Sequence, residues 1–244
     1  MGIKRYENPY KDRPKRHEIK ILLSYPKYVE LRARVAGILT PDPHMPGPEG
    51  YLIRSVYMDT LRDDGYYEKD SGVQHRDKYR MRAYNGDDSF IVLENKEKID
   101  DRICKTSVRI SRADYDAVLQ GDFSVFEKKE EALPQEILAL HRAHGLTPKV
   151  IVEYYREAFT HPLSMVRVTF DRMVAAGMNT LDMFDENLVT SPVFDKREVI
   201  LEIKYDDAFP MYLKQLLQNN GIRLAVSKYV ICRDKLKQNY ICLQ

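Results

Sequence analysis

The stretch Lys78-Tyr79-Arg80-Met81-Arg82 constrains this chain most, because it alternates cations with apolar residues. Successive side chains of a β-strand point to opposite faces, so this stretch predicts one face of cations and one apolar face. Cations spaced roughly 7 Å apart on one face repel one another, and they help a strand only when anions lie opposite. One such strand alone is also typical of a solvated sheet surface. Recurrence of the same pattern in other strands would favour a shared charged interior instead.

The alternation recurs along the chain, and we predict seven to eight strands joined mostly in antiparallel fashion. The turn Asn85-Gly86 joins the first stretch to its neighbour as a hairpin. The further predicted strands cover residues 16–22, 51–59, 90–98, the segment of Lys105 to Ile110, 150–159, 165–173 and 198–205.

Helical patterns separate these strands. We predict helices from Ser24 to Thr40, over 61–69, 111–119 and 133–144, and after Pro210. Residues 175–196 read as irregular, and the end of the chain, after Ser227-Lys228-Tyr229, reads as a short apolar stretch followed by Lys-rich turns. The pattern predicts an α+β fold.

Closing the sheet into a barrel accounts for the charged faces better than an open sheet does. An open sheet of this size normally mixes Thr, Ser and Gln into its wet face. In a barrel the charged faces line a hydrated lumen, and the apolar faces turn outward under the helices. Such a lumen needs anions, because like charges in a medium of reduced polarity repel strongly. We therefore expect a polyanion site, with Glu18 and Glu202 as places for a hard divalent metal.

Length, composition and charge limit the classes of protein to which this chain can belong. The chain has 244 residues, 43% of them hydrophobic and 31% charged, with a net charge of +2. We expect an N-terminal arm over residues 1–14 and one domain over 15–244. We expect no intrinsic membrane span and a cytoplasmic protein, because the chain has neither a run of about 20 apolar residues nor the apolar core of a signal peptide. Three cysteines without CxxC spacing argue against a disulfide framework or a zinc site.

A series of short motifs in a fixed order carries a resemblance to a known family. The motifs are Arg-His-Glu-Ile-Lys at 16–20, Ser-Val-Tyr-Met-Asp at 55–59, Lys-Tyr-Arg-Met-Arg at 78–82, Leu-Glu-Asn-Lys at 93–96, Tyr-Tyr-Arg-Glu-Ala-Phe at 154–159, Arg-Val-Thr-Phe-Asp at 167–171, Leu-Glu-Ile-Lys-Tyr at 201–205 and Ser-Lys-Tyr at 227–229. Over about residues 15–235 the chain resembles the VTC (vacuolar transporter chaperone) domain, which belongs with the CYTH-like triphosphate tunnel metalloenzymes.

The resemblance implies a fold and an activity. The fold is an eight-stranded antiparallel β tunnel. The activity is that of a polyphosphate polymerase, a phosphotransferase that moves the γ-phosphate of ATP or another nucleoside triphosphate onto inorganic polyphosphate, with Mn²⁺ or Mg²⁺ as cofactor. Inorganic pyrophosphate and triphosphate are further implied ligands. The sibling hydrolases and adenylate cyclases carry Glu-x-Glu-x-Lys in the first strand, whereas this chain has Arg16 in place of the first Glu and keeps Glu18 and Lys20. That departure favours the VTC branch.

Alternation and resemblance together predict the site residues. The expected catalytic cations, which grip phosphate oxygens, are Arg80, Arg82, Lys96, Lys105, Arg156, Arg167 and Lys228. Further phosphate-binding residues, expected from their strand face, are Lys20, Lys78, Arg109 and Lys204. The expected metal ligands are Glu202 and Glu18, while Glu94 is interpreted as a charge balancer, and Tyr57 and Tyr154 as packing residues or as supporting hydroxyls.

Other functions stay open. A triphosphatase acting on inorganic triphosphate or nucleotides would use the same tunnel, and so would a polyphosphate-binding module without turnover. The Glu202 carboxylate argues mildly against the module. Nucleic-acid binding would require aromatic side chains interleaved with cations on one platform, and the stretch 78–82 offers only Tyr79, on the opposite face. We therefore expect no nucleic-acid partner.

Overall fold

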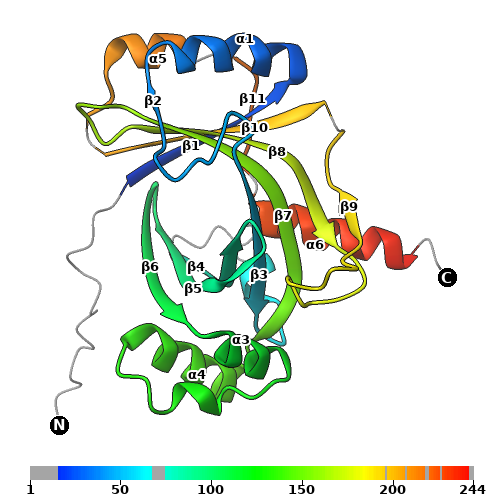
Figure 1. The fold of residues 1–244 in the computed structure, drawn as a ribbon. Helices are drawn as coiled ribbons and strands as arrows, with labels where there is room; N and C mark the ends of the chain where they lie inside the picture. The colour runs from blue at the N-terminus through cyan, green and yellow to red at the C-terminus, as the bar shows by residue number, and fades with distance from the viewer. Residues whose placement is uncertain are drawn as a thin grey trace.

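Eight antiparallel strands close into a ring in the computed structural model of this chain, which describes residues 16–67, 75–195, 197–206, 208–217, 220–225 and 227–241 (Figure 1). The arm expected over residues 1–14 lies outside the described residues. In ring order the strands are β7 (Thr147–Thr160), β3 (Tyr51–Asp59), β4 (His75–Tyr84), β5 (Asp87–Ile99), β6 (Arg102–Ile110), β1 (Arg16–Ser24), β10 (Glu198–Tyr205) and β8 (Arg167–Gly177). The β7–β8 pairing completes the ring, which confirms the predicted eight-stranded tunnel.

Three short strands extend this ring without changing it. β2 (Thr40–Pro41) pairs with β7, β9 (Thr190–Pro192) with β8, and β11 (Ile222–Arg223) with β1. Among the described residues, which begin at Arg16, two pairs join β1 to β6: Arg16 with Ile103 and His17 with Arg102.

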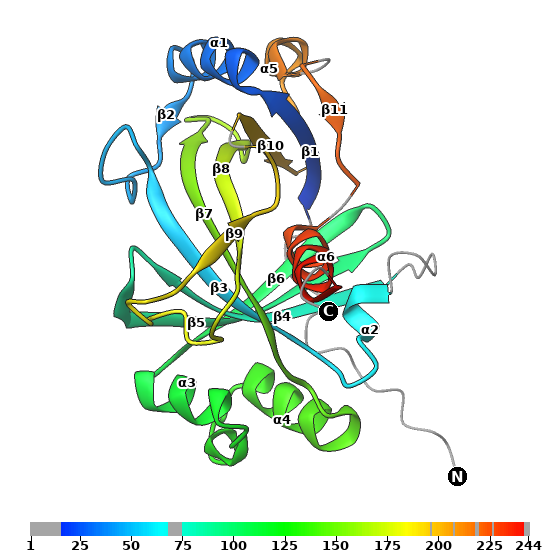
Figure 2. The same cartoon turned by 90° about the vertical axis from the view of Figure 1, so that its right-hand side faces the viewer.

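Two layers of helices cover opposite outer faces of the ring, as Figures 1 and 2 both show. One layer contains α3 (Arg112–Leu119), a short 3₁₀ helix (Ser124–Phe126) and α4 (Ala132–His144). The other contains α1 (Tyr25–Ala36) and α5 (Met211–Leu217). The apolar faces predicted from alternation lie under these layers: Tyr79 and Met81 of β4 pack in the core that includes Tyr115 of α3 and Ile137 of α4. Burial of these faces fixes which side of each strand points inward.

Local signals set the helix ends. Ser111 accepts a hydrogen bond from the Asp114 amide while the Asp114 carboxylate accepts one from the Ser111 amide, which makes a capping box at the start of α3. Gly145 ends α4 in the left-handed conformation, with φ of 64°, where a residue without a side chain is favoured. The helix predicted over 61–69 is only one turn in the described residues, α2 (Asp64–Tyr67), and residues 68–74 lie outside them.

The structure corrects the C-terminal prediction. The expected Lys-rich turns form a helix instead, α6 (Lys228–Ile241), which lies between the two helical layers in Figure 2. Its apolar side chains Tyr229 and Cys232 pack among residues of β3, β7, β8 and β10. The polar residues of α6 also have partners within the fold, since Arg233 donates to Asp63 at 2.8 Å. This helix escaped prediction because its contacts leave no clean apolar stripe.

The lumen is less uniformly charged than expected. Tyr57 and Tyr154 contact the inward arginines, and alternation places Ile53 of β3 and Val152 of β7 on the same inward faces. These residues form a packed apolar cluster with Tyr229 of α6. Part of the tunnel is therefore a closed hydrophobic core, and a charged cavity lies in the remainder.

A bulge explains why β8 was predicted to end too early. Met173 adopts a φ of 54°, which is rare outside glycine, and the β7–β8 register shifts beside it. The strand nevertheless continues to Gly177, and Val174 joins the inner apolar cluster. The shift breaks the alternation on which the prediction depended.

Candidate active site in the tunnel

A cavity of about 420 Å³ occupies the charged part of the tunnel. Among the described residues, eleven lysine and arginine side chains line it against three carboxylates, so the lining carries a large surplus of positive charge. The cations come from β1, β4, β5, β6, β7, β10 and the start of α6. The cationic members are Lys20, Arg76, Lys78, Arg80, Arg82, Lys96, Lys98, Lys105, Arg156, Lys204 and Lys228.

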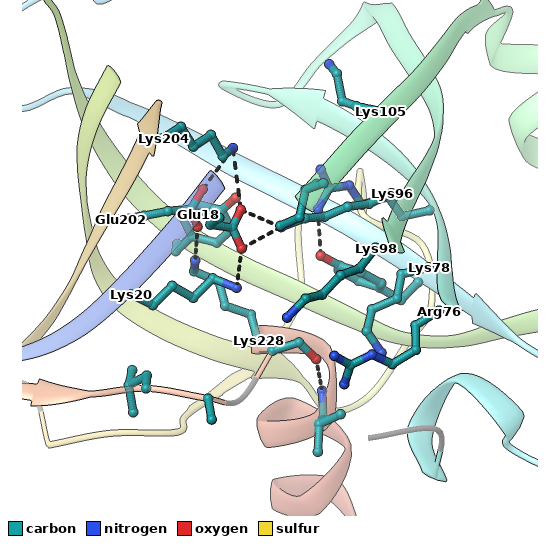
Figure 3. A pocket seen from close by; sticks show the side chains of 18 of the residues that line it. Glu18, Lys20, Arg76, Lys78, Lys96, Lys98, Lys105, Glu202, Lys204 and Lys228 are labelled. Atoms are coloured by element: carbon teal, nitrogen blue, oxygen red, sulfur yellow. Dashed lines mark hydrogen bonds and ion pairs between the residues drawn. The ribbon is translucent and has the colours of Figure 1, made fainter. Parts of the chain in front are cut away.

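The Glu18 and Glu202 carboxylates lie on neighbouring strands and share Lys204 as an ion-pair partner (Figure 3). Lys96 Nζ lies 2.9 and 2.7 Å from the two carboxylate oxygens of Glu18, and Lys20 Nζ lies 2.7 Å from one of them. Lys204 Nζ lies 2.8 Å from Glu202 Oε1 and 3.9 Å from Glu18 Oε2. The pairs hold both carboxylates in the lumen as anions.

The titration of this cluster follows from burial and charge. Burial and Glu202 raise the pKa of Glu18, but Lys96, Lys20 and Lys204 outweigh them and lower it to about 2. Burial lowers the pKa of Lys96 to about 7, because desolvation and the neighbouring Lys20 and Lys204 outweigh attraction to the two carboxylates. Desolvation opposes ionisation of Glu202 as well, yet the surrounding cations hold its pKa well below the usual value. The carboxylates are therefore poor proton acceptors near neutral pH.

A second buried carboxylate group holds the arginines of β4. Arg80 contacts Glu94 Oε2 through Nε at 2.7 Å and Nη2 at 2.6 Å, and Lys105 Nζ lies 3.0 Å from Glu94 Oε1. Arg80 also donates to the Tyr57 hydroxyl at 2.6 Å. Glu94 is 1% exposed. Its expected role as a charge balancer agrees with these contacts.

Asp171 of β8 holds two further cations, and sequence analysis missed it. Arg156 donates to both its carboxylate oxygens, at 2.6 and 2.7 Å, and Lys228 of α6 forms an ion pair with it. Asp171 is fully buried. The sequence signal that could have identified Asp171 is its position two residues after Thr169, which places both side chains on the inward face of β8.

The structure places most of the predicted site residues together but separates two of them. The predicted residues that line the cavity are Glu18, Lys20, Lys78, Arg80, Arg82, Lys96, Lys105, Arg156, Glu202, Lys204 and Lys228. Arg109 lies outside it, opposite Val92, where it stacks on Phe90 and donates to the Ser89 carbonyl at 2.7 Å. Arg167 also lies outside, paired with Asp42 at 2.8 Å. Alternation indicates the face of a strand but not the position along it, which is why these two predicted residues lie apart from the others.

Arg76 and Lys98 line the cavity although they were not among the predicted site residues. Both continue the inward alternation of their strands, Arg76 before Lys78 and Lys98 after Lys96. The same signal that identified their neighbours could have found them.

A further group with metal-ligand composition lies on the opposite side of β4 and β5. His75, Asp77 and Glu97 offer ligand atoms within 4.8 Å of one another, and His75 Nε2 lies 2.7 Å from Glu97 Oε1. Asp77 and Glu97 alternate with the lumen-facing Lys78 and Lys96, so this group does not face the tunnel.

Comparison with known families agrees with this arrangement. A family model, described as the VTC domain, matches residues 15–237. The chain belongs to the VTC domain family. No curated protein matches this VTC domain. None of the described helices is long and apolar enough to cross a membrane.

Solved structures with a similar chain course were also found for this VTC domain. A putative adenylate cyclase from Bacillus halodurans has 10% sequence identity and a TM-score of 0.44, with 94% of this chain and 92% of that chain covered. A putative adenylate cyclase from Vibrio parahaemolyticus also has 10% identity and a TM-score of 0.44, with 88% and 97% covered. A conserved hypothetical protein from Pyrococcus furiosus has 12% identity and a TM-score of 0.40, with 82% and 85% covered.

Proposed function

We propose that this VTC domain is a polyphosphate polymerase, which transfers the γ-phosphate of ATP or another nucleoside triphosphate onto an inorganic polyphosphate chain. The observation that carries the proposal is the surplus of cations over carboxylates in the cavity. A partly desolvated cluster of like charges is unfavourable by itself and becomes favourable when a polyanion enters. Arginines that present two N–H groups suit phosphate oxygens in particular.

The roles of the cations follow from their places. Arg80 and Arg82 of β4, Lys96 of β5 and Arg156 of β7 reach the cavity from different walls. Together they would hold the triphosphate and neutralise the charge that spreads over the transferred group. Glu94 and Asp171 keep these arginines in place before the substrate arrives, so little reorganisation is needed when it binds.

The proposed reaction moves one phosphoryl group. A terminal oxygen of the polyphosphate chain forms a bond to the γ-phosphorus, the bond from that phosphorus to the β–γ bridging oxygen breaks, and the nucleoside diphosphate leaves with the electron pair. A phosphate terminus is already largely ionised near neutral pH, so it needs no general base. Consistent with this, no histidine is among the described residues that line the cavity, and Glu18 and Glu202 have pKa values too low for efficient proton abstraction.

A divalent metal fits the Glu18 and Glu202 pair. Both carboxylates are ionised and lie in the lumen beside the phosphate-binding cations, and hard cations such as Mg²⁺ are typically bound by one or two carboxylates together with substrate phosphates. A bound Mg²⁺ or Mn²⁺ would neutralise charge on the phosphate oxygens. Lys204 contacts both carboxylates, and Lys96 and Lys20 contact Glu18, so these lysines would have to move for a metal to bind the two carboxylates jointly.

Product analysis with ATP labelled in the γ-phosphate tests the proposal. We expect label in polyphosphate chains longer than the primer when purified protein is given Mn²⁺ or Mg²⁺ and a short polyphosphate primer. Label released entirely as orthophosphate, with no chain intermediate, would make the protein a triphosphatase. Binding of polyphosphate without any turnover would make it a binding module.

Two variants sharpen this assignment. Glu202→Gln should abolish transfer. Its affinity for tripolyphosphate should stay measurable, because the cations remain, and should depend less on the metal than that of the wild type. Arg109→Ala removes an exposed cation that lies outside the cavity, and this variant should transfer phosphate normally.

The expected cytoplasmic location stays a prediction, which microscopy of the tagged protein can check.

A further inference from the structure

Cations face one another directly in two successive inward-facing residue pairs of the β4–β5 ladder. Arg76 lies opposite Lys98, and Lys78 lies opposite Lys96. Directly opposed side chains on one sheet face have Cβ atoms about 5 Å apart, and like charges at that distance destabilise the pairing. In the next inward-facing pair the pattern changes, because Arg80 lies opposite Glu94. The strand pair therefore carries balanced charge at Arg80 and Glu94, and an excess of positive charge towards Arg76 and Lys98.

The Arg76–Lys98 rung differs from the rest of the cavity in its lack of acidic partners. Lys96 is held by Glu18 and Lys105 by Glu94. In contrast, no carboxylate among the described residues lies within 4.0 Å of the charged nitrogens of Arg76 or Lys98. The Arg76 Nε atom is buried, and no described residue provides a hydrogen-bond partner for it. Figure 3 shows both side chains beside Lys78, apart from the Glu18 and Glu202 pair.

The surroundings relieve this charge only in part, because Glu18 and Asp101 attract Lys98 from beyond ion-pair distance. Asp101 is the remaining carboxylate of the cavity lining, but its side chain is 74% exposed and pairs with His17 at 3.2 Å. Burial and the repulsion from Arg76 lower the pKa of Lys98. A structural role for this rung would require a counter-ion from the protein, and the described residues supply none within ion-pair distance.

We propose that Arg76 and Lys98 form a second anion subsite, which binds phosphate groups of a condensed phosphate beyond those held by the central cations. Arg76 lies six positions from Arg82, so inward cations extend over roughly 20 Å of β4. This row is longer than the phosphate part of a nucleoside triphosphate. The subsite would thus give the protein a preference for long chains over triphosphate. The inference rests on the proposed function, because it assumes that condensed phosphates enter this cavity.

Calorimetry with two probes tests the subsite. The probes are tripolyphosphate and a size-fractionated longer polyphosphate, and the variants are Arg76→Ala, Lys98→Ala and their combination. We expect the double variant to lose about tenfold or more in affinity for the longer chain, with tripolyphosphate affinity within about twofold of wild type. Arg109→Ala is the matched control, since it removes an exposed cation outside the cavity and should change neither affinity.

Stability provides a second readout. In phosphate-free buffer at low salt, the double variant should melt at or above the wild-type temperature, because removal of opposed cations relieves repulsion. A lower melting temperature would show that the rung is structural. Equal losses of affinity for both probes, or no loss for either, would overturn the subsite while leaving the proposed function intact. Failure of the wild type to bind either probe would overturn the proposed function itself.

Discussion

Lys96 Nζ contacts both carboxylate oxygens of Glu18, at 2.9 and 2.7 Å, although 78 positions separate the two residues in the chain. The contact crosses the lumen between β5 and β1, which are not neighbours in the ring. It therefore brings a cation and an anion from separate walls of the tunnel to one point. A phosphate that binds Lys96 must compete with Glu18 for it.

Replacement of Lys96 tests whether its protonation controls ligand binding. The pKa of Lys96 is lowered to about 7 by burial, so the free protein should lose this cation as the pH rises from 6 to 8. Wild-type affinity for tripolyphosphate should then fall about tenfold more over this range than the affinity of Lys96→Arg, which keeps its charge. Titration calorimetry at both pH values measures the difference. Because both proteins are titrated with the same ligand, protonation of tripolyphosphate affects both affinities equally. Parallel pH profiles would contradict the prediction.

Glu18 should contribute to stability except in acid. Its folded pKa is about 2 against an ordinary value of 4.5, so its stabilising contribution is present above pH 4.5 and is lost as the pH falls towards 2. Glu18→Gln removes this titration, so its unfolding free energy should depend less steeply on pH between 4.5 and 2 than that of the wild type. Urea unfolding at several pH values measures both slopes. Identical slopes would show that Glu18 does not carry the linkage.

Arg80→Ala should destabilise the protein even without ligand. The change removes two contacts to Glu94, which is 1% exposed, and leaves a buried carboxylate with fewer partners. Breaking a buried pair on one side costs about 3–5 kcal/mol. Urea unfolding in phosphate-free buffer measures the loss, with Arg109→Ala as the exposed control, for which a change within about 0.5 kcal/mol is expected. A loss that small for Arg80→Ala would argue against the pair as a structural element.

Asp171→Asn should make the protein more dependent on a bound anion. Arg156 and Lys228 share the Asp171 carboxylate, and the change leaves both buried cations without a full counter-charge. The variant should melt below the wild type in phosphate-free buffer. Saturating tripolyphosphate should raise its melting temperature by more than it raises that of the wild type, because the ligand replaces the lost charge. Thermal melts at equal ionic strength, with sulfate as the control anion, make the comparison, and an equal rise in both proteins would contradict it.

The sequence by itself determined the strands and the side of each strand that carries charge. Period-two alternation is a local property, so the stretch 78–82 predicts its cationic face without knowledge of any other strand. Turn and cap residues are equally local, as Ser111 and Gly145 show. The order of the motifs was enough to recognise the family and, through it, the tunnel.

Only the tertiary structure decided which charges meet. Alternation gives a face but no position along the tunnel, so Arg109 shares a face with Lys105 and still lies outside the cavity. Closure of the ring sets the position, because the register of every strand pair adds to that of the next around the barrel. The bulge at Met173 and the packing of α6 likewise depend on contacts between distant segments. The types of side chain that face the lumen can thus be predicted from each strand alone, whereas their positions relative to one another depend on all eight strands.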